Sequence, residues 1–247
     1  MEWIAEDRLA VEVHPEPVRL PDWLRRAVDR HWEAEVAEHP RFFRGPVLTV
    51  ATAVQEAGRL QVLAQFTDYA HYLFGRHLPS GDRWRVRPVF AVACPLTAEG
   101  HLVVAQMSEE TARPLWVQAI GGAATPEDVA GGRFLPVPAA SRAVVAALGL
   151  DLEHDLKRPP AFVGAVWDPT GPLALAVRFD LIAPWEDVER SARARREAAE
   201  AGKPSDWARL LALPWGEAGL EVLRSAQWEV APYLPALLAQ EALRRAL

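Results

Sequence analysis

Residues 116–122, WVQAIGG, and residues 142–150, RAVVAALGL, decide the fold that this sequence predicts. The first stretch is typical of a strand, because it is rich in apolar and β-branched residues and ends at a glycine pair. The second belongs to an apolar helix over residues 138–148, which Gly149 ends in the position that favours a left-handed conformation. Together they predict a strand, a loop, a helix and a second loop.

Strand-like runs flank this segment on both sides. Residues 84–94 and 101–107 precede it and are joined by a turn, and residues 161–167 and 173–182 follow it around the turn DPTG at 168–171. We expect these four runs to join residues 115–120 in one central sheet, with the helix 138–148 packed on it. The fold class predicted is therefore α/β (α+β).

The N-terminal part is expected to contain a strand at 9–14 and an amphipathic helix that starts near Pro21 and ends before Pro40. A β-hairpin of residues 47–54 and 60–66 and a helical turn at 68–74 follow. At the other end we expect a polar surface helix at 185–201, with acidic and basic residues at i,i+4 spacing, and two more helices near 205–213 and 231–247.

These elements predict three segments that pack as one compact unit. Residues 1–45 form a strand and helix extension, residues 46–183 form the core, and residues 184–247 form a C-terminal helical segment on that core. Because half of the 247 residues are hydrophobic, the chain has ample material for a packed interior.

Composition excludes several classes of function. A net charge of −6 argues against binding a nucleic-acid polymer, which requires an excess of Lys and Arg. No apolar run approaches the roughly 18 residues that span a bilayer, so no membrane partner is expected. The opening residues MEWIAED do not resemble a secretory signal, and Cys94 is the only cysteine. We therefore expect a cytoplasmic protein, and the Ala, Arg and Leu bias suggests a bacterial source.

The two quoted stretches resemble the motif of the Nudix hydrolase superfamily. In that family a glycine pair leads through a loop into a helix reading Arg-Glu-apolar-x-Glu-Glu-x-Gly-apolar. The matching positions here are Gly121, Gly122, Arg142, Val144, Gly149 and Leu150. The resemblance covers roughly residues 87–182, and it implies a mixed-sheet α/β/α sandwich with helical additions at both ends.

The same motif lacks its metal ligands. Ala143, Ala146 and Ala147 stand where the family places the glutamates that hold magnesium or manganese against a pyrophosphate. Magnesium takes oxygen ligands, which an alanine does not offer. The loop is also about six residues longer than usual if Asp128 replaces the family's loop glutamate. The resemblance is thus to a member with a degenerate Nudix box, and no metal cofactor is expected.

A second likeness lies upstream of the motif. Residues 42–46 (FFRGP), the hairpin and residues 68–72 (DYAHY) are similar to the leader of larger Nudix proteins that act on nucleoside-diphosphate sugars. If that likeness extends to function, it implies a nucleotide ligand.

Several residues are candidates for binding such a ligand. Arg83, Arg85 and Arg87 alternate, so on a strand they would share one face and could grip phosphate; the alternative is a solvated face paired with acids. Trp116 could stack on a base or a sugar, although most tryptophans are core or interface anchors. The retained motif positions Gly121, Gly122 and Arg142 complete this set.

Other polar residues have a structural explanation beside a functional one. Glu127 and Asp128 are the candidate metal ligands, but such acids are also common at the start of a helix or turn. The acids and His154 at 151–155 are typical of a solvated loop. The seven histidines contain no His-Glu-x-x-His pair, so packing is the expected role of each, and Cys94 is expected to be a buried hydrophobic residue.

Three hypotheses of function follow. The first is a non-catalytic module, a pseudoenzyme that binds a small phosphorylated or nucleotide ligand or another protein. The second is a pyrophosphohydrolase of nucleoside-diphosphate-linked substrates that uses substitute acids to hold Mg²⁺ or Mn²⁺. The third is a structural homodimer with a vestigial site. The missing glutamates favour the first hypothesis.

Overall fold

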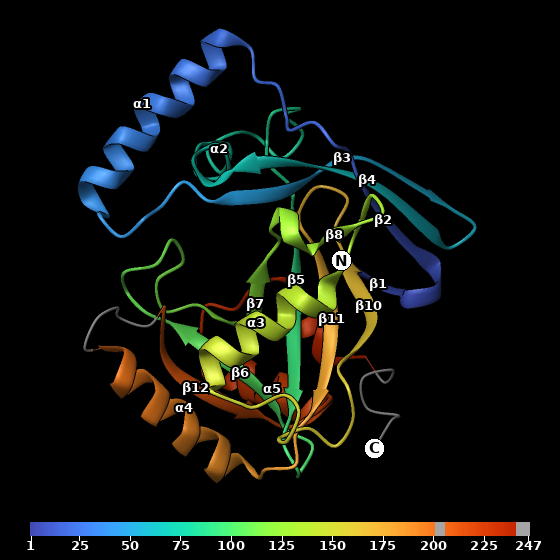
Figure 1. The fold of residues 1–247 in the computed structure, drawn as a ribbon, viewed down its shortest axis with the longest axis vertical. Coiled ribbons are helices and arrows are strands. Elements are labelled where there is room, and N and C mark those ends of the chain that lie inside the picture. Colours follow the sequence, from blue (N-terminus) through green and yellow to red (C-terminus); the bar gives the residue numbers. More distant parts are fainter. Residues whose placement is uncertain (201–205, 241–247) are drawn as a thin grey trace.

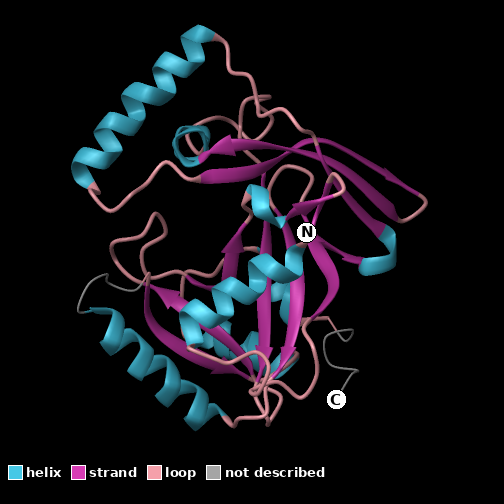
Figure 2. Ribbon diagram, in the orientation of Figure 1, coloured by secondary structure: helices cyan, strands magenta, loops and turns pink. Residues whose placement is uncertain are grey.

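The computed structural model of the protein describes residues 1–200 and 206–240 (Figure 1). A mixed sheet of 12 strands forms its centre, and helices lie on both sides of that sheet (Figure 2). The expected α/β class is confirmed. Within the described residues, no helix combines the length and apolar character needed to cross a membrane.

The N-terminal residues contribute to the sheet at two separate places. Strand β1 (Glu2–Ala5) pairs antiparallel with β10, and after the short 3-10 helix η1 (Glu6–Arg8), β2 (Leu9–Val13) pairs parallel with β4. Helix α1 (Asp22–Glu38) then lies at one end of the molecule (Figure 1). The predicted strand at 9–14 and the amphipathic helix are confirmed, whereas β1 was not predicted.

The predicted hairpin is also present. Strands β3 (Pro46–Glu56) and β4 (Arg59–Asp68) are joined by Ala57 and Gly58, whose φ angles of 47° and 74° suit the tight turns that connect twisted strands. Helix α2 (Tyr69–Gly75) begins directly afterwards, where the Asp68 carboxylate caps it by accepting a 2.9 Å hydrogen bond from the His71 N–H.

The centre of the sheet is built around β5 (Pro88–Leu96). Its neighbours are β11 (Leu173–Asp180), which is parallel, and β7 (Val117–Ala123), which is antiparallel. Strand β6 (Leu102–Met107) continues the sheet beyond β7, and β10 (Ala161–Trp167) continues it beyond β11. This strand order places the glycine pair of β7 directly beside Ala91 and Val92 of the central strand β5.

Helix α3 (Pro136–Leu148) covers one face of this centre (Figure 1). It follows the 3-10 helix η2 (Pro126–Asp128) and the two short strands β8 (Val129–Ala130) and β9 (Arg133–Phe134). Its buried side contains Ala139, Ala140, Val144 and Leu148, and it ends at Gly149, whose φ is 68°. The succession of strand, loop, helix and loop that the sequence predicts is therefore present.

Helices of the C-terminal segment complete the layers. Helix α4 (Trp185–Glu200) packs beside α3 through Val188 and Ala192. Helices α5 (Glu217–Ser225) and α6 (Tyr233–Leu238) cover the opposite face, where Leu234 and Leu237 share a core with Val92 of β5. The sheet thus lies between two helical layers, as in an α/β/α sandwich.

The prediction of a helix at residues 205–213 was wrong. Residues Trp207–Leu213 form strand β12, which pairs antiparallel with β6. Strand pairing with the free edge of β6 determines this conformation, because strand preference depends on neighbours more than on local sequence. Of the helix expected at 231–247, the described residues contain α6, and residues 241–247 lie outside them. Residue 201, the last residue of the helix expected at 185–201, also lies outside the described residues. Helix α5 was not predicted.

The start of the strand predicted at residues 84–94 was also wrong. Strand β5 begins at Pro88, because the preceding residues form a turn. The Asp82 carboxylate accepts a 2.7 Å hydrogen bond from the Trp84 N–H, and the Asp82 carbonyl accepts one of 3.1 Å from the Arg85 N–H. The alternation of Arg83, Arg85 and Arg87 on one strand face therefore does not exist.

Candidate ligand-binding site

The contact between β7 and α3 depends on one of the two glycines. A β-carbon on Gly122 would lie 2.2 Å from the carbonyl oxygen of Ala139, which no side chain tolerates. A β-carbon on Gly121 would meet nothing closer than the Ala91 oxygen at 3.7 Å, an ordinary contact. Gly122 is thus required for packing, whereas Gly121 is exposed and is not.

The motif helix presents alanine where the family has carboxylates. Ala143, Ala146 and Ala147 line a cavity of about 360 Å³ whose other walls include Arg195 and Arg196 of α4. Among the described residues, Asp206 is the single acid that lines this cavity, and its carboxylate lies 3.5 Å from Arg41. A magnesium or manganese ion needs several oxygen donors, so the residues of α3 do not fit the metal that the resemblance implies.

The loop acid Asp128 is fully engaged with protein partners. Its two carboxylate oxygens accept hydrogen bonds of 2.6 Å each from Arg142, and Oδ2 also accepts one of 2.9 Å from the Thr125 N–H. Burial alone would raise the pKa of Asp128, but the bonds from Arg142 and Thr125 outweigh it and lower that pKa. Asp128 and Arg142 therefore brace the loop against α3, while Glu127 is fully exposed.

A separate cleft lies between α2, β7 and the segment before α6, and we name it the cationic cleft. It has a volume of about 360 Å³. Among the described residues that line it, the charged side chains are all arginines, and no aspartate or glutamate is present. Its charged and aromatic members are Arg76, Arg85, Arg113, Tyr69, Tyr72, Phe90 and Tyr233. A positive cleft in an acidic protein favours an anionic ligand.

Protein contacts hold the three arginines in position. Arg76 donates to the Ala112 carbonyl at 2.9 Å, and Arg85 donates to the Leu78 carbonyl at 2.6 Å. Arg113 lies with its guanidinium carbon 4.5 Å from the centre of the Trp116 ring and reaches the Tyr72 hydroxyl at 3.4 Å. A guanidinium has five N–H donors, so these contacts leave donors that can bind phosphate oxygens.

Aromatic rings form another part of the cleft wall. The rings of Tyr69 and Tyr72 stack with their centres 5.7 Å apart and an angle of 29° between their planes. Burial raises the pKa of Tyr69 to about 12, so its hydroxyl remains protonated at neutral pH. A neighbouring cavity of about 630 Å³ shares Tyr69, Tyr72 and Arg113 with the cleft, which gives room for a ligand longer than one phosphate group.

The structure brings together only some of the sequence-predicted site residues. Arg85, Gly121 and Gly122 line the cationic cleft. Arg83, Arg87 and Trp116 do not line the cleft. Arg83 lies 4.7 Å from the centre of the Trp84 ring, and Arg87 donates to the carbonyls of Val50 and Pro169. Trp116 packs against the guanidinium of Arg113.

Sequence reasoning missed Arg76, Arg113 and Tyr233. They come from three distant parts of the chain, so no sequence motif contains them together. The aromatic segment at 68–72 was the one feature of the sequence that pointed to this region. The acids at 151–155 lie in an exposed loop, where Asp151 contacts His154 at 2.9 Å. Cys94 is fully buried, which raises its pKa to about 12 and leaves the thiol unreactive.

Comparisons with known proteins find similar structures, with low sequence identity and low TM-scores. No family model matches the chain, and no curated protein sequence does. The crystal structure of a Nudix hydrolase from M. smegmatis, RenU, has 18% identity and a TM-score of 0.38, and it covers 64% of this chain and 83% of its own. The solution structure of the E. coli ORF135 protein has 15% identity and a TM-score of 0.35, with 64% and 92% covered.

Proposed function

We propose that this protein binds a small phosphorylated ligand with an aromatic ring, such as a nucleotide, in the cationic cleft, and that it does so without metal chemistry on α3. The observation that carries this proposal is the composition of the cleft: three arginines, four aromatic rings and no described acid. In this interpretation the Nudix-like frame serves as a binding module.

The expected contacts follow from the chemistry of the lining. Phosphate oxygens would accept hydrogen bonds from Arg76, Arg85 and Arg113, because a guanidinium matches a phosphate with two parallel N–H donors. A base would stack on one of the tyrosine rings, which is favourable for any base. Gly121 is exposed and lines the cleft, so its backbone would permit close approach of the ligand to β7.

A second candidate function is hydrolysis of a nucleoside-diphosphate-linked substrate. The observation that favours it is the place of Asp206, which lines both the cavity beside the α3 alanines and the cavity next to the cleft. Magnesium is commonly bound by one or two carboxylates together with substrate phosphates. In this case Asp206, and not an acid of α3, would hold the ion.

The experiment that tests the binding proposal is calorimetric titration of the protein with ADP, UDP-glucose and inorganic pyrophosphate in the presence of EDTA. We expect a nucleotide to bind, and Arg113→Gln or Arg76→Gln to weaken it by at least about tenfold, because each removes a charge-assisted hydrogen bond. Arg133→Gln, on exposed β9 outside the cleft lining, is the control and should bind normally. No binding, or equal binding by all variants, contradicts the proposal.

The same samples separate binding from hydrolysis. With Mg²⁺ or Mn²⁺ in place of EDTA, chromatography of the nucleotide should show no products if the protein is a binding module. Metal-dependent release of a nucleoside monophosphate that is lost in Asp206→Asn would establish the hydrolase instead. Light scattering on these samples tests the homodimer hypothesis.

A further inference from the structure

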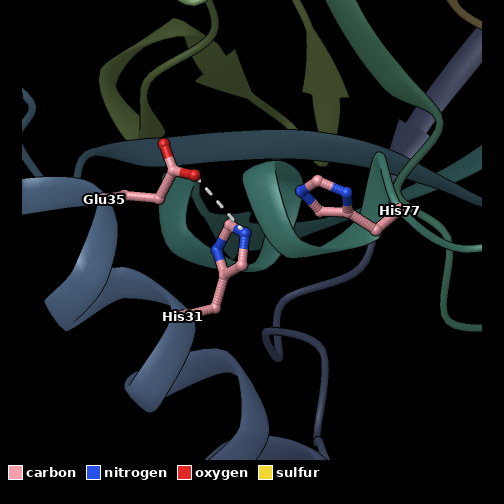
Figure 3. Close-up of side chains that lie close together, drawn as sticks. All are labelled: His31, Glu35 and His77. Atoms are coloured by element: carbon pink, nitrogen blue, oxygen red, sulfur yellow. Dashed lines mark ion pairs between the residues drawn. The ribbon is translucent and has the colours of Figure 1, made fainter. Parts of the chain in front are cut away.

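Three potential metal ligands from two elements converge at the end of the molecule that carries α1. His31 and Glu35 belong to α1, and His77 follows the end of α2. One ligand atom from each residue lies within 4.8 Å of the other two. Figure 3 shows the three side chains pointing toward a common space between the two elements. In the described part of the chain, no other three His, Cys, Asp or Glu side chains bring their ligand atoms this close together.

The fold explains why these residues meet. His31 and Glu35 are four residues apart, so they occupy the same face of α1 one turn from each other. That face packs on α2, since Leu24 and Val28 share a small core with Ala70. The His77 N–H donates to the Phe74 carbonyl at 3.1 Å, which continues the turn of α2 and keeps His77 next to α1. The His31 and His77 ring centres lie 5.0 Å apart.

The geometry is close to that of a tetrahedral metal site. Metal–ligand bonds of about 2.0–2.1 Å at tetrahedral angles separate neighbouring ligand atoms by about 3.4 Å. His31 Nε2 already lies 3.5 Å from Glu35 Oε1. His77 is exposed, and its ligand atom lies within 4.8 Å of the other two, so a side-chain rotation that moves it by about 1.4 Å or less would bring it to the tetrahedral spacing.

The polar atoms of His31 also lack competing partners. Its second ring nitrogen, Nδ1, is buried and has no hydrogen-bond partner among the described residues. The ion would bind the other ring nitrogen, Nε2, which faces Glu35, so Nδ1 does not compete with the site and is not paired by the ion. Binding a cation between these residues would break no hydrogen bond of this ring apart from its contact with Glu35.

We infer that His31, Glu35 and His77 form a binding site for a divalent transition-metal ion, with Zn²⁺ as the best match. Two imidazoles and one carboxylate suit zinc and its neighbours, whereas magnesium prefers oxygen ligands alone. Three protein ligands leave the fourth position to water on the exposed side of His77. The ion would join α1 to the end of α2 and so fix the helix that supplies Tyr69, Tyr72 and the adjoining Arg76 to the cationic cleft.

The observations for this site do not rest on the proposed ligand function. Its residues come from α1 and from the chain just after α2, whereas the alanines belong to α3, on a different part of the molecule (Figure 1). A failure of nucleotide binding would leave the zinc proposal intact, and the reverse is also true.

The test is calorimetric titration of the EDTA-treated and dialysed full-length protein with Zn²⁺, paired with Co²⁺ binding followed by visible absorption. We expect one equivalent of Zn²⁺ to bind and to raise the melting temperature, because an ion that binds only the folded state stabilises it. His77→Ala and Glu35→Gln should each weaken binding by at least about tenfold, a loss typical of disturbed metal sites. Both variants keep the apolar contact between α1 and α2, so they should fold.

The matched control is His154→Ala, which removes an exposed histidine that also contacts an acid, Asp151. It should leave Zn²⁺ affinity, stoichiometry and the cobalt spectrum unchanged. The proposal is overturned if His77→Ala and Glu35→Gln bind Zn²⁺ as tightly as the unaltered protein, or if that protein binds no stoichiometric zinc.

Discussion

At the residue scale, α3 offers no carboxylate to a metal ion, and the buried acid of the loop before it is already paired. Ala143, Ala146 and Ala147 of α3 line a cavity but offer no ligand atom. The nearest loop acid, Asp128, is bound by Arg142 through both oxygens. Asp128, a predicted metal ligand, and Arg142, a predicted ligand-binding residue, thus bind each other.

Asp180 is a charged residue on which we expect stability to depend strongly. It is 4% exposed, and its carboxylate accepts a 2.8 Å hydrogen bond from Arg178, itself 3% exposed, and another from Arg158. Asp180→Asn should lower the free energy of unfolding at pH 7 by about 3–5 kcal/mol, because a buried charge on Arg178 loses its counterion. Urea unfolding measures this, and Asp187→Asn, in an exposed pair with Arg190, should change it by less than about 1 kcal/mol.

The pH dependence of this effect has a definite sign. Burial alone would raise the pKa of Asp180, but the bonds from Arg158 and Arg178 outweigh it and lower that pKa below the usual value. The carboxylate therefore stabilises the fold fully above about pH 4, and this stabilisation disappears as the pH falls through the lowered pKa. The difference between Asp180→Asn and the unaltered protein should shrink below pH 4; a constant difference would contradict the assignment.

At the element scale, the packing of α3 on β7 provides a matched pair of variants. Gly122→Ala should abolish folding or lower the free energy of unfolding by several kcal/mol, because the added methyl group meets the Ala139 carbonyl at 2.2 Å. Gly121→Ala, one residue earlier in the same strand, should cost about 1 kcal/mol or less. Chemical denaturation measures the free energy of unfolding of both variants. Equal values would contradict the close approach of β7 to α3 at Gly122.

Most elements could be predicted from sequence because their signals are local. Proline and spacing by fours marked α1, the Ala57–Gly58 turn marked the hairpin, and Gly149 marked the end of α3. Strand β12 could not, because its conformation depends on hydrogen bonds to β6, about 100 residues earlier in the chain. The turn at Asp82 was missed for a related reason: a side-chain cap replaced the expected backbone pairing.

At the scale of the whole molecule, the distribution of charge matters more than its sum. The chain has a net charge of −6, yet the described lining of the cationic cleft contains only arginines as charged groups. We expect the affinity for ADP to fall several-fold as ionic strength rises from low to about 0.5 M, because salt screens these attractions. The same protein should not retain duplex DNA at physiological salt. Fluorescence titration measures both, and salt-independent ADP binding would argue against guanidinium–phosphate contacts.

The sequence by itself determined the class of fold, the order of most elements and the absence of acidic residues from α3. These depend on residue type and on spacing within one segment, which the chain carries locally. Only the tertiary structure decided which side chains meet: Arg76, Arg85 and Arg113 in the cationic cleft, and His31, Glu35 and His77 at the end of α2. Their neighbours are set by helix packing and strand order, because contacts between distant segments exist only once the chain has folded.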